Sequence, residues 1–279
     1  MTAARSTLSV LVLARNEEAR IASCLERVQW ADDIVVVDDM STDRTAELAR
    51  RSGARVVRRA FDDFSSQGNF GLDHIQGDWV LALDADEWVT PALRDEILRM
   101  LQQPTVCRGF TYKRLNFFLG HRMRYGGWYH DILRLFRRDG TRFAGRVHHT
   151  PQVQGAVGRL SGEVEHRPFR SLEQFISRQN RYSSDQAREW YEEQGPGLVP
   201  RVREHLIWKP WKLFWKFLVK KQGFREGMHG VVFAGLFAWV HFLEWAKYFE
   251  RVEGFASGAP RPSKALQEAG GGPDHHAVL

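Results

Sequence analysis

The fold of this chain is decided by the stretch Trp79-Val80-Leu81-Ala82-Leu83-Asp84-Ala85-Asp86-Glu87. An apolar run that stops at an Asp-x-Asp pair is typical of a buried strand whose tip holds a cationic group. Two carboxylates this close repel one another unless a cation lies between them, and oxygen ligands favour Mg2+ or Mn2+. Such an ion would in turn hold a substrate diphosphate. The alternative interpretation is that Asp84 and Asp86 only cap the turn after the strand.

Upstream of this stretch, apolar runs alternate with amphipathic patterns. This order predicts an α/β fold with a mostly parallel sheet. In such a sheet, ligands bind beyond the carboxyl ends of the strands. The expected strands are 8–14, 33–38, 54–57 and 79–84, and the expected helices are 17–30, 45–51, 65–75 and 91–103.

Polar residues gather where these strands end. Asn16 and Glu17 follow the first strand, and Asp38 and Asp39 end the second. Together with the Asp-x-Asp pair they predict one crevice that holds a nucleotide. A carboxylate at Asp38 can accept a hydrogen bond from a base N–H or a ribose hydroxyl. Taken singly, each residue is equally well explained as a turn or helix cap.

Three segments together carry a family resemblance: LSVLVLARNEE at 8–18, VVDDMSTDRT at 36–45 and LDADE at 83–87. They resemble the family 2 glycosyltransferases of the GT-A fold. The segment FSSQGNFGL at 64–72 is similar to the Phe-x-x-Gln-Lys/Arg-Asn segment of the lipopolysaccharide core glucosyltransferase branch. The resemblance implies a Rossmann-like, mostly parallel central sheet flanked by helices.

The resemblance also implies roles for single residues. Asp86 would bind the metal, Mg2+ or Mn2+, together with Asp84. Asp84 and Ala85 would contact the ribose and the diphosphate. The other nucleotide-sugar contacts would come from Ala14, Arg15, Asn16, Glu17, Asp38, Gln67 and Asn69.

Two positions depart from the pattern of that branch. Gly68 stands where the branch has a basic residue, so one positive charge is missing near the nucleotide, and Arg58 or Arg59 could compensate. Asp39-Met40 replaces the commoner Ser-Gly, which predicts a changed loop after the second strand.

The acceptor is expected to bind within residues 106–170, where strands are predicted at 109–115, 132–137 and 141–147,. Between the first two lies the loop 125–131, YGGWYHD, whose aromatic rings and glycines suit a sugar,. An inverting transfer needs a base near the acceptor hydroxyl. Asp131 is the first choice, because it ends this aromatic loop and precedes the segment at 134–138, which also resembles the family. The related branch commonly has Val-His-Glu where this chain has Val147-His148-His149, so His149 is the alternative.

The histidines His148, His149 and His166 match no compact zinc motif, and no cysteine supports one,. His166 ends a predicted strand at 162–165. It is a further candidate ligand of the nucleotide-bound metal, and its alternative is a structural histidine.

The segment after residue 171 predicts helices rich in aromatic and basic residues. Trp208, Trp211 and Trp215 alternate with lysines, as in helices that lie in the interface of an anionic membrane,. The alternative is a packed helix with snorkelling lysines. The stretch 230–248 is the most apolar, but His241 and Glu244 make it too polar to span a bilayer comfortably, so an in-plane or re-entrant hairpin is expected,.

Length and composition agree with a folded protein in a reducing compartment. The 279 residues carry a net charge of +6 and only two cysteines, too few for a disulfide framework,. The apolar start at 8–14 runs into Arg15-Asn16-Glu17 without a cleavage pattern, so it predicts a core strand rather than a signal peptide,. The expected parts are a nucleotide-sugar-binding half (1–105), an acceptor-binding half (106–170), a helical extension that associates with a membrane (171–252) and a disordered tail (253–279).

These features predict a metal-dependent, inverting transferase on the cytoplasmic, inner face of the cell membrane. The family resemblance implies that it moves a hexose, with glucose first, from a uridine diphosphate sugar to a glycan or lipid-linked acceptor such as lipopolysaccharide core. No feature outside the basic aromatic helices favours nucleic acid as a partner. Two alternatives are a nucleotidyltransferase, which would need a glycine-rich loop where residues 14–17 have ARNE, and a non-catalytic membrane adaptor,.

Overall fold

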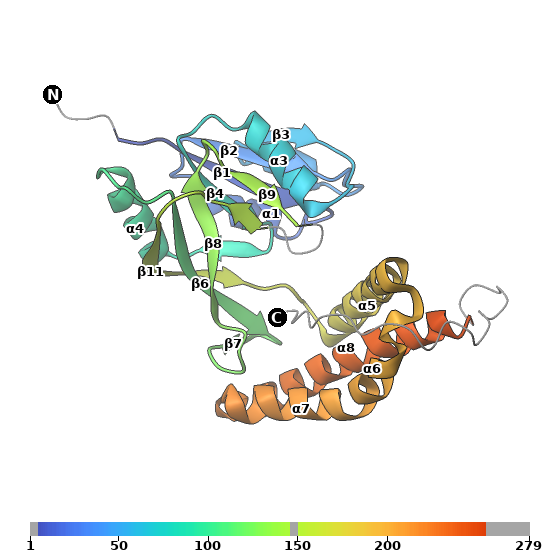
Figure 1. The fold of residues 1–279 in the computed structure, drawn as a ribbon. Helices are drawn as coiled ribbons and strands as arrows, with labels where there is room; N and C mark the ends of the chain where they lie inside the picture. The colour runs from blue at the N-terminus through green and yellow to red at the C-terminus, as the bar shows by residue number, and fades with distance from the viewer. Residues whose placement is uncertain (1–4, 146–149, 255–279) are drawn as a thin grey trace. The chain divides into compact units, whose positions relative to one another are not determined.

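The computed structural model describes residues 5–145 and 150–254 of the chain (Figure 1). The chain divides into two compact units. The sheet unit comprises Met1–Arg124 and Trp128–Pro168, and the helical unit comprises Tyr125–Gly127 and Phe169–Leu279. The short segment Tyr125–Gly127 therefore groups with the helices and not with the predicted acceptor-binding half that surrounds it in sequence.

The described part of the sheet unit is built on nine strands in the order β3-β2-β1-β4-β8-β6-β11-β5, with β7 paired to β6. The strands β3, β2, β1 and β4 are parallel, whereas β8 pairs antiparallel with both β4 and β6. The bounds are β1 (Leu8–Ala14), β2 (Asp33–Asp38), β3 (Arg55–Arg58), β4 (Trp79–Asp84), β5 (Glu87–Val89), β6 (Gly109–Phe118), β7 (His121–Met123), β8 (His130–Arg137) and β11 (Val157–His166), beside a ribbon of β9 (Arg142–Ala144) and β10 (Thr150–Gln152).

The sheet has a hydrophobic core on each face. Along β1, Val10 and Val12 belong to one core and Leu11 to the other. Strands buried on both faces read as continuous apolar runs, which is why β1, β2 and β4 were recognisable in the sequence. The first core includes residues of α1 (Ile21–Glu26), α2 (Thr45–Arg51) and α4 (Pro91–Leu101), and the second includes residues of α3 (Phe64–His74) and β9. The predicted α/β class with a parallel-rich central sheet is confirmed.

One predicted helix is shorter than expected. The pattern at 17–30 predicted a single helix, but α1 begins only at Ile21 and ends at Glu26. Its start is displaced because the backbone N–H of Glu17 donates to Oγ1 of Thr45, at 2.7 Å, which keeps residues 15–18 in a loop. The boundaries of β1, β2, β4 and α2 match their predictions.

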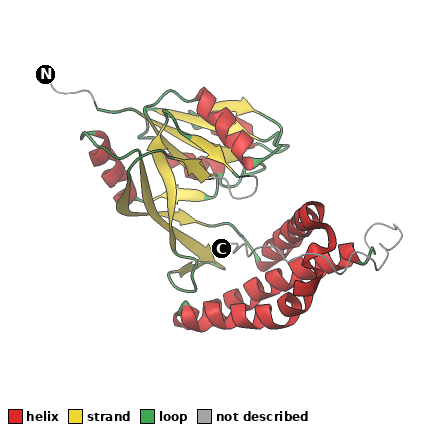
Figure 2. Ribbon diagram, viewed as in Figure 1, coloured by secondary structure: helices red, strands yellow, loops and turns green. Residues whose placement is uncertain are grey.

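The described part of the helical unit contains helices and no strand (Figure 2). Ser171 caps its first helix by accepting a hydrogen bond from the N–H of Gln174,. Ala187, Val202, Trp245 and Tyr248 form its core. The elements are α5 (Leu172–Gln194), η1 (Gly195–Leu198), α6 (Val199–Arg203), η2 (Glu204–Trp208), α7 (Lys209–Trp215), η3 (Lys216–Lys220), η4 (Gly223–Glu226) and α8 (Met228–Val252).

Among the described residues, α8 alone is long and apolar enough to cross a membrane, judged by length and composition. Only 28% of its most apolar window is buried. The predicted disordered tail falls, from residue 255 onward, outside the described residues, as do His148 and His149.

Candidate active site

The acidic residues predicted from the strand ends lie at one edge of the parallel half of the sheet. Ala14 of β1 lies opposite Asp38 of β2, and Leu13 of β1 lies opposite Asp84 of β4. Asp38 and Asp84 therefore flank the end of the same strand. The buried Ala85 and Asp86 follow in the turn between β4 and β5. This edge is where open α/β sheets bind their ligands.

An arginine from β6 ties Asp84 to a buried glutamate. Arg114 donates from Nε to Oε1 of Glu87 (2.6 Å) and from Nη2 to Oδ2 of Asp84 (2.9 Å). Glu87 is fully buried, and its Oε2 accepts the backbone N–H of Asp84. Burial by itself lowers the pKa of Arg114, but the carboxylates of Glu87 and Asp84 hold that pKa above its usual range,. A permanent positive charge therefore lies beside the Asp-x-Asp turn.

Asp86 lies beside a histidine whose ring is oriented by another side chain. Oδ1 of Asp86 is 3.5 Å from Nε2 of His166, and its Oδ2 is 3.6 Å from Nη1 of Arg20. Nδ1 of His166 is 2.5 Å from Oδ1 of Asn116, whose Nδ2 donates to the carbonyl of Trp128. Because Asn116 presents its oxygen to the ring, Nδ1 of His166 donates this hydrogen bond, and the ring is oriented with Nε2 facing Asp86,.

This pair fits part of the shell of a divalent ion. Two neighbouring ligands of Mg2+ at about 2.1 Å lie about 3 Å apart, close to the 3.5 Å that separates Asp86 from His166. No group of three or more His, Cys, Asp or Glu side chains is arranged to hold a metal within residues 5–145 and 150–254. Mg2+ commonly takes one or two protein ligands and completes its shell with phosphate oxygens and water. The donor set therefore fits a metal that arrives with a diphosphate.

The carboxylates of this turn also act on Cys24 of α1. Its thiol is fully buried, and Sγ lies 3.9 Å from the carbonyl oxygen of Asp84. Burial raises the pKa of Cys24, and the charges of Glu87, Asp86, Asp84 and Glu17 raise it further,. The thiol stays protonated and is no nucleophile. The same local negative charge attracts a cation.

Asp38 is buried beneath the loop that follows β2. Its side chain is fully buried, its Oδ2 accepts from Nε of Arg58 (3.1 Å), and its Oδ1 accepts from the N–H of Ser41 (3.3 Å). Arg58 is thus engaged by Asp38, while Arg59 pairs with Asp62 at 2.6 Å. In this structure both arginines that could replace the missing charge at position 68 have carboxylate partners.

The loops after β1 and β2 hold one another. Oδ1 of Asn16 accepts the N–H of Thr42 (2.9 Å), and Nη1 of Arg15 lies 2.9 Å from Oδ2 of Asp39. Asn16 and Met40 both adopt positive φ, +53° and +48°. Met40 therefore takes a glycine-like conformation at the position where the related branch has Gly, so the substituted loop keeps a left-handed residue there.

The α3 segment contacts the β9–β10 ribbon. Asn69 exchanges two hydrogen bonds with the backbone of Phe143, at 2.9 and 3.0 Å. A Cβ at Gly68 would come within 2.6 Å of the Phe143 ring, so packing explains why no basic side chain occurs there,. Nε2 of Gln67 donates to the carbonyl of Arg59, and its buried Oε1 has no hydrogen-bond partner among the described residues.

Asp131 does not join this cluster. It pairs across the ladder with Lys113, and its carboxylate is 3.1 Å from Nζ of Lys113 and 3.4 Å from Nη2 of Arg159. Its neighbour His130 pairs instead with Arg114. Because successive side chains of a strand point to opposite faces, His130 lies on the face where Arg114 meets Asp84, and Asp131 lies on the other.

The sequence reasoning missed the residues that surround the predicted aspartates. His130 is one: burial lowers its pKa, and the nearby charges of Arg114 and His166 lower it further,. The others are Arg20, Glu87, Arg114 and Asn116. Side chains alternate between the two faces of the strand along residues 112–116, and this alternation could be seen in the sequence. Which of the two faces carries the site can be inferred only once the strand pairing is known.

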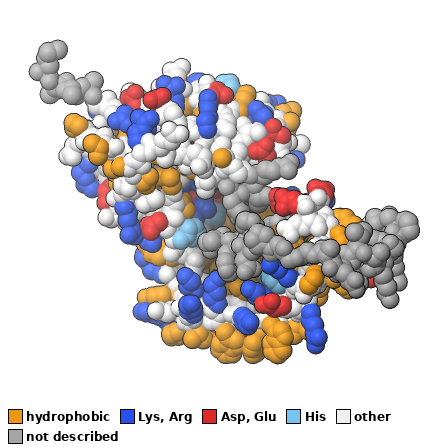
Figure 3. All heavy atoms as spheres, viewed as in Figure 1, with side chains coloured by type: hydrophobic (Ala, Val, Ile, Leu, Met, Phe, Trp, Pro, Cys, Tyr) orange, Lys and Arg blue, Asp and Glu red, His pale blue; other side chains and the backbone are white. Residues whose placement is uncertain are grey.

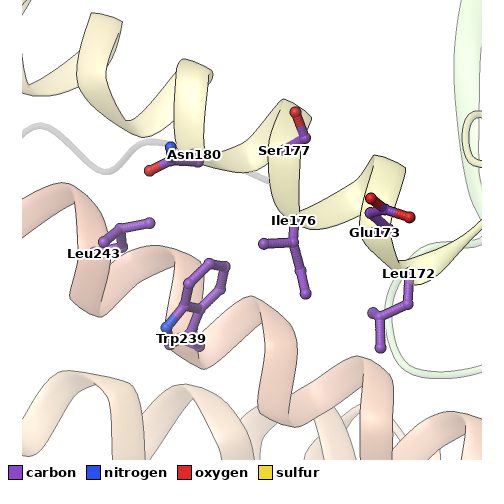
Figure 4. Close-up of a pocket in the computed structure, with 7 residues that line it drawn as sticks. All are labelled: Leu172, Glu173, Ile176, Ser177, Asn180, Trp239 and Leu243. Atoms are coloured by element: carbon purple, nitrogen blue, oxygen red, sulfur yellow. The ribbon is translucent and has the colours of Figure 1, made fainter.

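The helical unit has a hollow of its own, about 510 Å³ in volume, between α5 and α8 (Figure 4). Ile176, Trp239 and Leu243 line it, with Glu173 and Asn180 among its polar side chains. One carboxylate among apolar side chains provides no set of groups for phosphate or metal chemistry, so the candidate active site is the edge of the sheet.

An open α/β sheet with acidic residues and arginines beyond its parallel strands suits a nucleotide-bound substrate at this edge. The comparison with known families agrees: residues 9–161 match the model of "Glycosyl transferase family 2". The chain belongs to this family and is a glycosyltransferase. This decides against the nucleotidyltransferase and the non-catalytic adaptor as alternatives.

Two curated relatives span nearly the whole chain. An uncharacterized glycosyltransferase of Rickettsia typhi is 30% identical over 257 residues, 87% of this chain and 87% of the relative. The "Lipopolysaccharide core biosynthesis glycosyltransferase LpsC" of Rhizobium meliloti is 30% identical over 258 residues, 88% of this chain and 92% of the relative.

Solved structures resemble the chain more distantly. Glucosyl-3-phosphoglycerate synthase from Mycobacterium tuberculosis gives a TM-score of 0.45 at 20% identity, covering 62% of this chain and 77% of that one. Mannosyl-3-phosphoglycerate synthase from Rubrobacter xylanophilus gives a TM-score of 0.44 at 17% identity, covering 67% and 75%.

Proposed function

We propose that this glycosyltransferase moves a hexose, with glucose the first candidate, from a uridine diphosphate sugar to a glycan or lipid-linked acceptor such as lipopolysaccharide core, with inversion. Residues 1–105 would bind the donor, and residues 106–170 would bind the acceptor. The observation that carries the proposal is the pair Asp86 and His166, 3.5 Å apart beside the Asp84–Arg114 ion pair. The name of the Rhizobium meliloti relative supports this acceptor class.

On the donor side, Asp86 and His166 would hold Mg2+ or Mn2+, which would offset the charge of the departing diphosphate. Arg114 and Arg134, whose Nη2 is 3.9 Å from Asp84, supply further positive charge near this turn,. Asp84 and Ala85 would lie along the ribose and diphosphate. The remaining donor contacts would come from Ala14, Arg15, Asn16, Glu17, Asp38, Gln67 and Asn69.

The acceptor hydroxyl needs a base, and β8 offers two candidates. Asp131 is the first choice from sequence, but its carboxylate is paired with Lys113 and Arg159. His130 lies on the face of Arg114, and its lowered pKa keeps the ring neutral and able to accept a proton at pH 7,. We favour His130. His130→Gln should then slow transfer about 10²-fold or more, and Asp131→Asn only a few-fold. A larger loss of rate in Asp131→Asn than in His130→Gln would identify Asp131 as the base.

The donor proposal is tested by thermal unfolding and by UDP release, with UDP-glucose added with and without Mn2+. Stabilisation should require both, because the ion and the diphosphate complete one another's ligands, and Asp86→Asn should abolish the metal dependence. The matched control is Asp95→Asn, which changes an exposed aspartate of α4. Stabilisation by UDP-glucose only in the absence of metal would contradict the role of Asp86 as a metal ligand. A lack of response to every nucleoside diphosphate sugar would overturn the proposed donor class.

A membrane surface is the proposed partner of the helical unit, on the cytoplasmic side of the cell membrane. The basic-aromatic face consists of Trp208, Trp211, Trp215, Lys212, Lys216 and Lys220. Its tryptophans are 60%, 61% and 44% exposed, and hydrophobic side chains gather with Lys and Arg along the lower edge of Figure 3. Exposed indole rings flanked by lysines suit an anionic interface.

Flotation with vesicles tests this partner. The chain should bind vesicles of mixed phosphatidylglycerol and phosphatidylcholine, and binding should fall when Trp208 and Trp211 are both changed to Ala. Vesicles of phosphatidylcholine alone are the control for charge. Equal binding of the double variant to the anionic vesicles would contradict this membrane surface.

A further inference from the structure

The loop Tyr125–Gly127 lies between β7 and β8 in sequence but groups with the helical unit, whereas its neighbours Arg124 and Trp128 belong to the sheet unit. Three residues that the sequence places among the acceptor-side strands are therefore held by the C-terminal helices. Two hydrogen bonds from backbone N–H groups and one ring contact hold the loop to the turn at residues 221–226, before α8.

The backbone of the loop is bound at two successive amides. The N–H of Tyr125 donates to Oε1 of Glu226 at 2.6 Å, and the N–H of Gly126 donates to the carbonyl of Lys221 at 2.8 Å. The guanidinium of Arg225 lies 4.0 Å from the centroid of the Tyr125 ring. Glu226 is only 8% exposed, so its bond to the Tyr125 amide is a charge-assisted bond in a buried setting,.

Glycines let the two backbones approach one another. Gly126 and Gly127 have φ of +78° and +83°, a conformation that L side chains rarely adopt,. A Cβ on Gly223 would lie 2.6 Å from the carbonyl oxygen of Phe217 and 3.4 Å from Cα of Gly126. A side chain at Gly223 would therefore disturb the turn where it meets the loop, and side chains at Gly126 and Gly127 would be strained by their backbone conformation,.

The other end of the loop leads directly to the candidate base. Trp128 follows Gly127, and its carbonyl accepts a hydrogen bond from Asn116. Tyr129 donates from its hydroxyl to Oε1 of Glu163, and His130 then begins β8. The segment from Tyr125 to His130 is thus held at its start by Glu226 and along its length by β6 and β11.

We infer that Glu226 is a positioning residue for acceptor transfer: through the Tyr125 amide it fixes the loop that sets the start of β8. This inference rests on the proposed function, because it concerns the acceptor side of that reaction. Glu226 does not reach the donor residues at the ends of β1, β2 and β4 through any of these contacts. Loss of its carboxylate should therefore disturb transfer and leave the donor side intact.

The first test is hydrogen–deuterium exchange of the full chain, which needs no turnover. In Glu226→Ala, peptides that cover residues 124–131 should exchange about 10-fold faster or more, because a buried hydrogen bond to a charged group is lost. Peptides of β1, β2 and β4 should be unchanged. The matched control is Glu193→Ala, which removes an exposed glutamate of α5. Unchanged exchange at 124–131 would overturn the inference, whatever donor or acceptor the enzyme uses.

The second test separates positioning from general stability. With UDP-glucose, Mn2+ and lipopolysaccharide from a core-truncated strain, kcat/KM for the acceptor should fall about 10-fold or more in Glu226→Ala. The hydrolysis of UDP-glucose without acceptor should stay within about two-fold. Glu226→Gln keeps a hydrogen-bond acceptor oxygen, so its kcat/KM for the acceptor should lie between those of the unaltered enzyme and of Glu226→Ala. This variant covers the case in which Glu226→Ala fails to fold. Faster exchange with unchanged transfer would overturn the positioning role. No turnover by the unaltered enzyme would instead overturn the proposed function.

Discussion

Arg114 and Glu87 form an ion pair in which the carboxylate is fully buried, and Nε of Arg114 lies 2.6 Å from its Oε1. Arg114→Met removes the guanidinium and leaves the buried Glu87 charge with its hydrogen bond from the N–H of Asp84. An uncompensated buried charge destabilises a fold by about 3–5 kcal/mol. Urea denaturation of the variant should show a loss of this size.

The control for that prediction is Arg122→Met, because Arg122 is 61% exposed and 3.6 Å from Glu165. Exposed ion pairs contribute at most about 1 kcal/mol. Equal losses of unfolding free energy for the two variants would contradict the special role of the buried pair, and so would full stability of Arg114→Met.

Asn116 orients the ring of His166, so under the proposed donor site it should affect metal binding without touching the ion,. Asn116→Leu keeps the approximate volume but removes the acceptor of the Nδ1 proton, which lies 2.5 Å away. Changes to such supporting groups lower metal affinity about 10–100-fold. A titration of Mn2+ in the presence of UDP, followed by electron paramagnetic resonance, measures this loss. Binding of UDP without metal serves as the control, and an unchanged Mn2+ affinity would exclude Asn116 from this role.

Met40 stores strain in the loop after β2, since its φ is +48°. A side chain in this region costs about 1 kcal/mol or more relative to glycine. Met40→Gly relieves that strain but gives the unfolded chain more freedom. We expect a net gain of about 0.5 kcal/mol in the free energy of unfolding, and no gain for Met40→Ala. If the alanine variant gains as much, the exposed side chain and not the backbone is responsible.

The sequence predicted the parallel half of the fold because its strands are buried on both faces. Continuous apolar runs marked β1, β2 and β4, and the polar residues at their ends marked the edge that carries Asp38, Asp84 and Asp86. These are local patterns, and each can be recognised without knowledge of the neighbouring strands.

The partners of those aspartates depend on strand pairing, which no local pattern specifies. Arg114 meets Asp84 only because β8 pairs antiparallel with β4 and β6, and the same register separates His130 from Asp131. A shift of one residue would exchange these two side chains between the faces of the sheet. The contact between Tyr125 and Glu226 joins residues 101 positions apart, so it could not be predicted from local sequence patterns either.

A pH-dependent stability is expected from the helical unit. Burial raises the pKa of Glu244 from 4.5 to about 7, while burial and then Lys209 lower the pKa of His205 to about 4. Burial, followed by His205 and Lys209, likewise lowers that of His241 to about 4. Nδ1 of His241 is 3.9 Å from Oε2 of Glu244. All three groups therefore favour their neutral forms in the folded protein.

The pH dependence of stability has opposite signs for the Glu244 carboxyl group and for the two histidine rings. A raised folded pKa stabilises the protein below the unfolded pKa, and this stability is lost as the pH rises from 4.5 toward 7 for Glu244,. The lowered pKa values of His205 and His241 have the opposite effect, so their stability is present above pH 6.5 and is lost as the pH falls toward 4,. With two rings against one carboxyl group, acidification below pH 6.5 should destabilise the unit on balance.

Glu244→Gln tests how much the ionisation of Glu244 destabilises the folded protein at alkaline pH. At pH 8 the glutamate must be charged in its buried position, whereas glutamine stays neutral, so the variant should be more stable than the parent by about 1–3 kcal/mol. At pH 4.5 the two proteins should differ much less, because Glu244 is then protonated in the fold. Urea denaturation at both pH values measures the difference, with exposed Glu250→Gln as the matched control on α8. The same gain at both pH values would assign it to packing and not to the titration of Glu244.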